Sequence, residues 1–253
     1  MVIDFTGKRV LVTGGTRGIG RGIVEAFLET GASVAVNGST PESTAQALGE
    51  LGAGGRAVAA PGSVGSVAGC RAVVDAALDA LGGLDVLVNN AGIDTEAPAG
   101  KIDEETWDRV VDTNLKGTFF TTQRALPALR ASRGNIVNMA SVLGLVGAVD
   151  ESMYCATKAG IISLTRSHAL EFAPDVRVNA VCPGVIDTDM LRTWATYMTG
   201  SVAAGYEILG ATNVFKRVAH VREIANPVLY LASDMASFVT GSIHVVDGAM
   251  IAD

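Results

Sequence analysis

Seven short apolar runs are spaced along the chain, and most are rich in valine and isoleucine. They do not alternate strictly between apolar and polar side chains, which is the pattern of strands covered on both faces. We therefore predict buried parallel strands at Lys8–Thr13, Ser33–Asn37, Arg56–Ala60, Asp85–Asn89, Asn135–Ala140, Arg177–Cys182 and Ser242–Val246.

Stretches with helical periodicity separate these runs. Apolar residues recur at the spacing of a helix face in Arg21–Thr30 and near 42–51, 66–81, 103–131, 153–172 and 221–233. Strands that alternate with helices are typical of a parallel sheet with helices on both faces. No linker or repeat divides the chain, so we predict one doubly wound α/β domain over residues 1–253, with about seven strands. In such sheets, ligands bind beyond the carboxyl ends of the strands.

Composition and charge narrow the function classes. The 253 residues carry a net charge of −7 without a basic cluster, so nucleic acid is not an expected partner. Apolar residues make up 49% of the chain, but no run is long enough to cross a bilayer, and Met1–Gly7 lacks the pattern of a secretion signal. The 3 cysteines and 3 histidines are scattered, which predicts reduced thiols in a cytoplasmic protein and no metal site.

A glycine-rich turn follows the first predicted strand. Gly14, Gly18 and Gly20 stand between that strand and the first predicted helix, in the spacing Gly-x-x-x-Gly-x-Gly. Glycines at such a turn let the backbone approach a pyrophosphate, which the N–H groups and dipole of the helix N-terminus attract. Glycines also serve ordinary tight turns. Their position between a strand and a helix favours a dinucleotide site in a Rossmann-type domain.

Tyr154 and Lys158 are four residues apart in the predicted helix 153–172, so they share one helix face. A free tyrosine has a pKa of about 10 and is a poor acid or base near neutral pH. A fixed positive charge beside the phenol favours the phenolate and lowers that pKa toward working pH. Such a pair is also common on partly buried helix faces, and it gains weight from the glycine turn that precedes it.

These features together resemble the short-chain dehydrogenase/reductase family. The resemblance covers nearly the whole chain and depends on the order of several short motifs: Thr13-Gly14-x-x-x-Gly18-x-Gly20, Asn89-Asn90-Ala91-Gly92, Asn114, Ser141, Tyr154-x-x-x-Lys158 and Pro183-Gly184. It implies an oxidoreductase that uses NAD or NADP and interconverts a ketone and a secondary alcohol. It also implies a cytosolic homotetramer, or a homodimer.

The resemblance implies four catalytic residues. Tyr154 would give a proton to the carbonyl oxygen in reduction, and Ser141 would hydrogen-bond that oxygen, where negative charge develops. Lys158 would lower the tyrosine pKa and hold the nicotinamide ribose, and Asn114 would orient a water that links the lysine to solvent. Structural roles stay open beside these: Ser141 can cap a helix or turn, Asn114 can satisfy backbone groups, and Lys158 can be solvated.

The same resemblance assigns the residues that contact the cofactor. They come from the glycine turn, from the ends of the next strands, from the Pro-Gly turn and from the catalytic pair: Gly14, Thr16, Arg17, Gly18, Ile19, Gly20, Asn37, Gly38, Ser39, Ser63, Val64, Asn90, Ala91, Gly92, Tyr154, Lys158, Pro183, Gly184, Ile186 and Thr188. Ser63 stands where the family usually has an aspartate that accepts a hydrogen bond from adenine. Serine accepts such a bond more weakly.

The choice between the two cofactors depends on the end of the second strand. Gly38 stands where NAD-preferring relatives carry an acidic residue for the ribose 2′-hydroxyl. The missing carboxylate removes the repulsion of a 2′-phosphate, and Arg17 matches the basic residue that similar NADP-dependent members point toward it. Ser39 replaces a second arginine of many such members. We expect NADP(H), with NAD(H) as the alternative, and expect Gly38→Asp to shift the preference toward NAD.

The substrate is defined only by class. Residues 187–215 would form a mobile lid, although its apolar side chains also fit subunit contacts. Apolar residues at 142–149, after the catalytic serine, predict a neutral, largely apolar carbonyl substrate. Four acidic side chains at the expected rim discourage anions: Asp94, Glu96, Asp150 and Glu151.

Two alternatives remain at this stage. Within the family, the pattern is most similar to the β-ketoacyl-acyl-carrier-protein reductases. Arg130 and Arg133 suit contact with an acidic acyl carrier, but the corner 172–175 has no basic residue where those enzymes commonly have one. A catalytically silent dinucleotide sensor is the other alternative. Loss of the tyrosine or the lysine would be its expected sign, and both are present.

Overall fold

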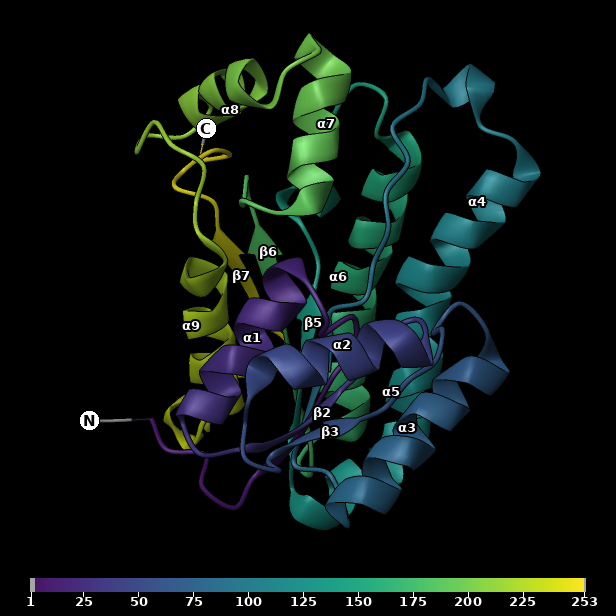
Figure 1. Cartoon of the computed structure of the whole chain (residues 1–253), viewed down its shortest axis with the longest axis vertical. Coiled ribbons are helices and arrows are strands. Elements are labelled where there is room, and N and C mark those ends of the chain that lie inside the picture. Colours follow the sequence, from purple (N-terminus) through teal and green to yellow (C-terminus); the bar gives the residue numbers. More distant parts are fainter. Residues whose placement is uncertain (1–2, 253) are drawn as a thin grey trace.

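The described part of the chain, residues 3–252 of a computed structural model, is built on one parallel sheet (Figure 1). Met1, Val2 and Asp253, at the ends of the predicted domain, lie outside the described residues. The sheet has seven strands in the order β3-β2-β1-β4-β5-β6-β7, as the fold prediction requires. Their bounds are β1 Arg9–Val12, β2 Ser33–Val36, β3 Ala57–Ala59, β4 Val86–Asn89, β5 Asn135–Met139, β6 Arg177–Pro183 and β7 Ile243–Val246.

Helices cover both faces of the sheet (Figure 1). Their bounds are α1 Gly18–Glu29, α2 Pro41–Leu51, α3 Val67–Leu81, α4 Glu104–Val111, α5 Gly117–Ser132, α6 Ser152–Phe172, α7 Asp189–Thr199, α8 Val202–Ala211 and α9 Val221–Ala232. One core cluster joins the sheet to α1 and α9, with α2 packed at its edge, and a second joins the opposite face to α3, α5 and α6. The sheet is therefore doubly wound.

The strand β1 shows why the apolar runs lack strict alternation. Val10 and Val12 belong to the core cluster on the α1 and α9 side, whereas Leu11 belongs to the cluster on the α3 and α5 side. All three side chains are fully buried. A strand that is buried on both faces needs an apolar residue at every position, because successive side chains point in opposite directions.

Two segments differ from the pattern expected of them. The predicted helix 103–131 is divided into α4 and α5 by a π-helical turn at Asp112–Lys116. This turn holds the candidate residue Asn114, which is fully buried. The segment 187–215, predicted only as a lid, contains the two packed helices α7 and α8, and Thr188 caps the first of them by accepting a hydrogen bond from the Leu191 N–H.

The strand order reverses between β1 and β4. From β1 the chain builds outward through β2 and β3, and then returns to place β4 on the other side of β1. Ligands of such sheets bind at the carboxyl ends of the strands on either side of this switch point. The predicted glycine turn and the Asn-Asn-Ala-Gly turn follow β1 and β4, so they meet there. None of the helices in residues 3–252 is both long and apolar enough to pass through a bilayer.

Candidate active site

The glycine turn packs tightly against the end of β4. Gly14 has φ of 61°, and an ideal Cβ on it would lie 2.9 Å from the Ala91 Cα. A Cβ on Gly20 would collide with the Gly14 carbonyl oxygen. At the start of α1, the side chain of Arg17 caps no N–H group. The turn therefore presents helix N–H groups that are free to bind an anion.

Thr13 and Asn90 join the two turns at the switch point. The Thr13 hydroxyl accepts hydrogen bonds from the N–H groups of Asn90 (2.9 Å) and Ala91 (3.0 Å). The Asn90 side-chain amide donates to the carbonyls of Thr13 (2.9 Å) and Gly14 (3.0 Å). The side chain of Asn90 thus holds the glycine turn in place, while Ala91 adds only a methyl group beside it.

Asn37 has a role that differs from the predicted one. Its amide nitrogen donates to the carbonyls of Gly38, Ala60 and Gly62, and its oxygen accepts from the Gly14 N–H (3.1 Å). The side chain is buried and its hydrogen-bonding atoms are all engaged. Asn37 therefore positions the loops after three strands, and its side chain is not free to contact a ribose.

The region expected to select the cofactor is open around Arg17 and crowded around Gly38. The side chains of Arg17 and Ser39 are exposed, and Arg17 forms no ion pair within residues 3–252. An ideal Cβ on Gly38 would lie 2.6–2.8 Å from side-chain atoms of Thr16, Ser43 and Thr44. Because these short side chains have little freedom to move, Gly38→Asp would disturb the loop. It is not a clean test of cofactor preference.

The predicted catalytic pair lies side by side on α6. The Lys158 ammonium is 5.3 Å from the centre of the Tyr154 ring, within the range of a cation–π contact. It also donates a hydrogen bond of 2.8 Å to the Met139 carbonyl at the end of β5. Ser141 follows two residues later, is 9% exposed, and accepts a hydrogen bond from the Leu143 N–H (3.1 Å). The structure thus brings Ser141, Tyr154 and Lys158 to one strand end.

Asn114 lies behind this pair. Its side-chain oxygen accepts from the Ile93 N–H (2.8 Å), and its amide donates to the Ile93 carbonyl (2.9 Å) and to the Thr157 hydroxyl (3.2 Å). The side chain therefore ties the segment after β4 to α6, next to Lys158. This arrangement matches the structural role considered for Asn114, and a role in orienting water remains a proposal.

The pKa values in the site differ from the simplest expectation. Burial lowers the pKa of Lys158 to about 8. Burial, followed by the charges of Asp94 and Glu151, raises the pKa of Tyr154 above its usual value, and only its hydrogen bond with Ser141 acts in the opposite direction. The net shift of the tyrosine pKa is therefore upward, opposite to the direction expected from Lys158. The ammonium donates to the Met139 carbonyl and lies over the ring of Tyr154.

Gly92 lies next to Lys158 at the expected place of the dinucleotide. A Cβ on Gly92 would meet Asn114, Lys158 and the Asn90 carbonyl at 3.5, 3.6 and 3.8 Å, which are ordinary contacts. Space therefore remains beside the lysine. Across the site, an ideal Cβ on Gly18 would lie 3.4 Å from the Thr188 methyl group, so the glycine turn faces the turn after β6. The remaining predicted contacts lie at the end of β6, in the turns that follow β1, β3 and β6, and in the first turn of α1: Thr16, Ile19, Ser63, Val64, Pro183, Gly184 and Ile186.

Two hydrogen bonds from tyrosines hold the segment 187–215. The Tyr197 hydroxyl, on α7, donates to the Asp150 carboxylate (3.0 Å), and the Tyr206 hydroxyl, on α8, donates to the Asp187 carboxylate (2.7 Å). The first bond joins α7 to the loop that leads into α6. Helices α7 and α8 lie together at one end of the molecule (Figure 1).

Three of the acidic residues predicted at the rim form a tight cluster. A carboxylate oxygen from each of Asp94, Glu96 and Glu151 lies within 4.8 Å of the others. Glu151 is only 3% exposed. The sequence places these residues near the site but has no signal for their burial or their mutual contact, since they come from two separate loops.

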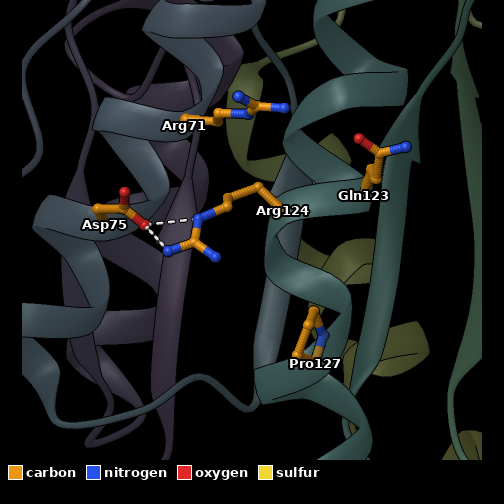
Figure 2. A pocket seen from close by; sticks show the side chains of 5 residues that line it. All are labelled: Arg71, Asp75, Gln123, Arg124 and Pro127. Carbon is orange, nitrogen blue, oxygen red and sulfur yellow. Dashed lines mark hydrogen bonds and ion pairs between the residues drawn. The ribbon is translucent and has the colours of Figure 1, made fainter.

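A hollow of about 410 Å³ on the outer surface of α3 and α5 is unrelated to this site (Figure 2). It is open and lined by Arg71, Asp75, Gln123, Arg124 and Pro127. Arg124 donates to the Asp75 carboxylate across it (2.6 Å). None of the predicted site residues lines this hollow.

Comparisons with known proteins agree with this geometry. The profile of the short chain dehydrogenase family matches residues 8–198. The chain is 39% identical to the 3-oxoacyl-[acyl-carrier-protein] reductase FabG of Staphylococcus aureus, over 96% of this chain and 98% of that protein. It is 38% identical to the FabG protein of the same name from Aquifex aeolicus, over 99% of this chain and 100% of that protein.

A solved structure agrees as well. The short-chain dehydrogenase/reductase SDR:Glucose/ribitol dehydrogenase of Brucella melitensis superposes with a TM-score of 0.91 at 32% identity, over 99% of both chains. Family members of this kind bind a nicotinamide dinucleotide at the switch point that the glycine turn occupies here. The chain therefore belongs to the short-chain dehydrogenase/reductase family, and it is an oxidoreductase that acts on ketone and CH–OH groups.

Proposed function

We propose that this protein reduces a ketone to a secondary alcohol with NADPH, and catalyses the reverse oxidation with NADP⁺. The observation that carries the proposal is the placement of Ser141, Tyr154 and Lys158 at the carboxyl end of β5, beside the glycine turn. The whole chain, 1–253, would act as one domain. The segment 187–215 would close over the substrate as a lid.

The roles of the side chains follow from their positions. NADPH would supply the hydride. Tyr154 would give its proton to the substrate oxygen, and the Ser141 hydroxyl would hydrogen-bond the same oxygen as negative charge develops on it. Lys158, with a pKa of about 8, stays largely charged at neutral pH and would hold the nicotinamide ribose. Asn114 would fix the segment after β4 against α6 and serve the proton path.

NADP(H) is the favoured cofactor because of charge. No carboxylate stands at position 38, and the exposed guanidinium of Arg17 has no acidic partner within residues 3–252. A 2′-phosphate carries charge that such a guanidinium binds well. The hydroxyls of Ser39 and Thr40 lie at the start of α2 and would add donors. NAD(H) remains the alternative.

The second candidate function is the reduction of 3-oxoacyl groups carried by an acyl carrier protein. The similarity to 3-oxoacyl-[acyl-carrier-protein] reductases over nearly the full chain favours it. The acidic cluster of Asp94, Glu96 and Glu151 opposes it, because the acyl carrier of that reaction is itself acidic. We therefore place a free ketone without an anionic group first, with an apolar body that fits the residues after Ser141.

Assembly and location complete the proposal. Large apolar side chains on α4, α5 and α6 are exposed, among them Trp107, Phe119 and Leu170. They suit the subunit contacts of a homotetramer or a homodimer. The free cysteines Cys70, Cys155 and Cys182 suit a cytoplasmic location.

The test follows the absorbance of NADPH in the presence of the protein and a panel of ketones. The panel includes free aliphatic and cyclic ketones and a 3-oxoacyl group attached to an acyl carrier protein. We expect turnover of free ketones, and a lower rate with NADH than with NADPH. Tight binding of NADPH without turnover of any member would favour a dinucleotide sensor. Turnover of the carrier-bound substrate alone would favour the second candidate.

A further inference from the structure

The acidic cluster at the rim is built by two loops that are held together. Asp94 and Glu96 belong to the segment after β4, and Glu151 immediately precedes α6. The Ala97 N–H donates to the Asp150 carbonyl (3.2 Å), which joins the two loops by their backbones. The Tyr197 hydroxyl bonds the Asp150 carboxylate from α7. The three carboxylates are therefore fixed in one place and do not meet by chance on a flexible surface.

The cluster has no cationic partner in the described residues. Within 3–252, no lysine, arginine or histidine nitrogen lies within 4.0 Å of the Asp94, Glu96 or Glu151 carboxylates. Two basic groups in this region are engaged with other partners: Lys158 donates to the Met139 carbonyl, and Arg109 donates to the Thr95 hydroxyl.

The burial of Glu151 makes the lack of a cationic partner unfavourable for the stability of the folded protein. Its side chain is 3% exposed, and its Oε2 atom has no hydrogen-bond partner in the described part of the chain. A carboxylate oxygen that is buried without a donor destabilises the folded protein. A proton shared between Glu151 and Asp94 offsets part of this cost, and a group with positive charge and several N–H donors would offset it further.

The cluster also lies next to the reacting atoms. Glu151 precedes Tyr154 by three residues at the start of α6, and Asp94 follows Gly92, whose Cβ position lies 3.6 Å from the Lys158 Nζ atom. The charges of Asp94 and Glu151 also help to raise the pKa of Tyr154, so a cation held by the cluster would lie near the expected place of the substrate. An ammonium group has three N–H donors for three carboxyl groups. Mg²⁺ or Ca²⁺ with water as further ligands also fits three carboxylates, so the experiments below distinguish a metal ion from an ammonium group.

We propose that Asp94, Glu96 and Glu151 form a subsite for a protonated amino group of the substrate, so that the enzyme acts on amino ketones and amino alcohols. This proposal rests on the ketone reductase function proposed above and refines its substrate class. The body of the substrate is apolar, and its amino group supplies the charge that an entirely neutral ketone lacks.

The proposal also predicts that binding of the amino group releases a proton from the cluster. Burial and the neighbouring carboxylates raise the pKa of Glu151 to about 8 and also raise that of Asp94. The cluster therefore holds a proton at neutral pH, which an entering ammonium group displaces. The groups that face it from the neighbouring elements are Asp150, Tyr154, Cys155, Lys158 and Tyr197.

The first experiment compares matched ketones with NADPH. The series holds the carbon skeleton constant and carries an ammonium, a hydroxyl or a carboxylate group one to four bonds from the carbonyl. We expect the best ammonium ketone to have a kcat/KM about tenfold or more above its hydroxyl analogue, in keeping with a charge-assisted hydrogen bond. A hydroxyl analogue that is equal or better overturns the proposal.

Variants assign that preference to the cluster. In Glu151→Gln and Asp94→Asn, the ratio of kcat/KM for the ammonium ketone to kcat/KM for its hydroxyl analogue should fall about tenfold. The matched control is Glu171→Gln, because Glu171 is exposed and lies on the same helix, about 30 Å from Glu151. The control should keep the wild-type ratio. A ratio that is unchanged in both cluster variants overturns the proposal.

The second experiment measures binding and does not depend on turnover. Calorimetric titration of the amino alcohol into the protein with NADPH, a pair between which no hydride is transferred, at pH 7 in two buffers of different ionisation enthalpy, should show release of protons. Glu151→Gln should abolish this release. Equal release in the two proteins overturns the proposal, and so does activity that requires added Mg²⁺, Mn²⁺ or Ca²⁺ and loses this requirement in Glu151→Gln. Amino alcohol binding with proton release, but no reduction of any ketone, supports the subsite and rejects the proposed reductase function.

Discussion

Burial raises the pKa of Glu151 and lowers the pKa of Lys158, so that both groups titrate near pH 8. The pKa of Glu151 is raised from 4.5 to about 8, so the folded protein binds more protons than the unfolded chain between these values. The contribution of this group to the free energy of unfolding therefore falls as the pH rises from 4.5 to about 8. The pKa of Lys158 is lowered from 10.5 to about 8, so its contribution rises with pH between about 8 and 10.5.

We expect these two residues to give a minimum of stability near pH 8. Urea unfolding across pH 5 to 10 measures it, and Glu151→Gln should flatten the fall between pH 5 and 8. Glu171→Gln is the matched control, because Glu171 is exposed on α6, and this variant should show the same decrease in stability between pH 5 and 8 as the wild type. An identical fall in Glu151→Gln would show that the carboxyl of residue 151 is not the group that titrates.

Lys158 has two functions in the proposed mechanism, so its variants should affect both kcat and NADPH binding, whereas Tyr154→Phe should affect mainly kcat. Lys158→Met should lower kcat by about 100-fold or more and weaken NADPH binding by about tenfold, since the same ammonium orients the tyrosine and the ribose. Steady-state kinetics and fluorescence titration of NADPH measure the two effects. Lys8→Met, at an exposed position, is the control. An unchanged dissociation constant would contradict the ribose contact.

At the residue scale, the sequence pattern locates side chains but not the backbone groups around them. The spacing of Tyr154 and Lys158 predicts their shared helix face, and the structure places them together. The Met139 carbonyl that accepts a hydrogen bond from the ammonium has no signal in the sequence, because every residue has a carbonyl. The hydrogen bonds of the Asn37 side chain were not predicted for a similar reason, since its partners are backbone groups of three loops, and its contact with the cofactor stays a prediction.

At the scale of elements, the glycine turn and the start of α2 frame the expected 2′-phosphate. Arg17→Gln should lower kcat/KM with NADPH by about tenfold and change kcat/KM with NADH by less than about twofold, because only the former carries the phosphate. Arg71→Gln, at an exposed position on α3, controls for the loss of one positive charge. Equal losses with the two cofactors would remove Arg17 from phosphate recognition.

The strands were predicted to within a residue or so at each end, because burial on both faces leaves a strong signal in the sequence. The break between α4 and α5 was not predicted. A π-helical turn adds one residue to a helix, and the apolar spacing of 103–131 does not reveal where. Helices α7 and α8 were predicted only as a lid, since their apolar residues suit a lid, a core or a subunit contact equally well.

At the scale of the whole molecule, exposed apolar side chains predict assembly. Leu170 on α6 is 83% exposed, although it is a large aliphatic residue. Leu170→Asp should lower the mass measured by light scattering, because a carboxylate in an apolar interface costs desolvation free energy. Ala45→Asp on α2 adds the same charge at another exposed position and should not change the mass. A wild-type mass of 25.9 kDa, that of one chain, would contradict the proposed tetramer or dimer.

The most direct measurement concerns the hydroxyl of Tyr154, since every step of the proposed reaction passes through the group that protonates the substrate oxygen. The experiment measures kcat with NADPH and the best ketone, together with the dissociation constant of NADPH, for the wild type and Tyr154→Phe. We predict that kcat falls by about 100-fold or more while the dissociation constant stays within about twofold. A Tyr154→Phe enzyme with a near-normal kcat would contradict the account.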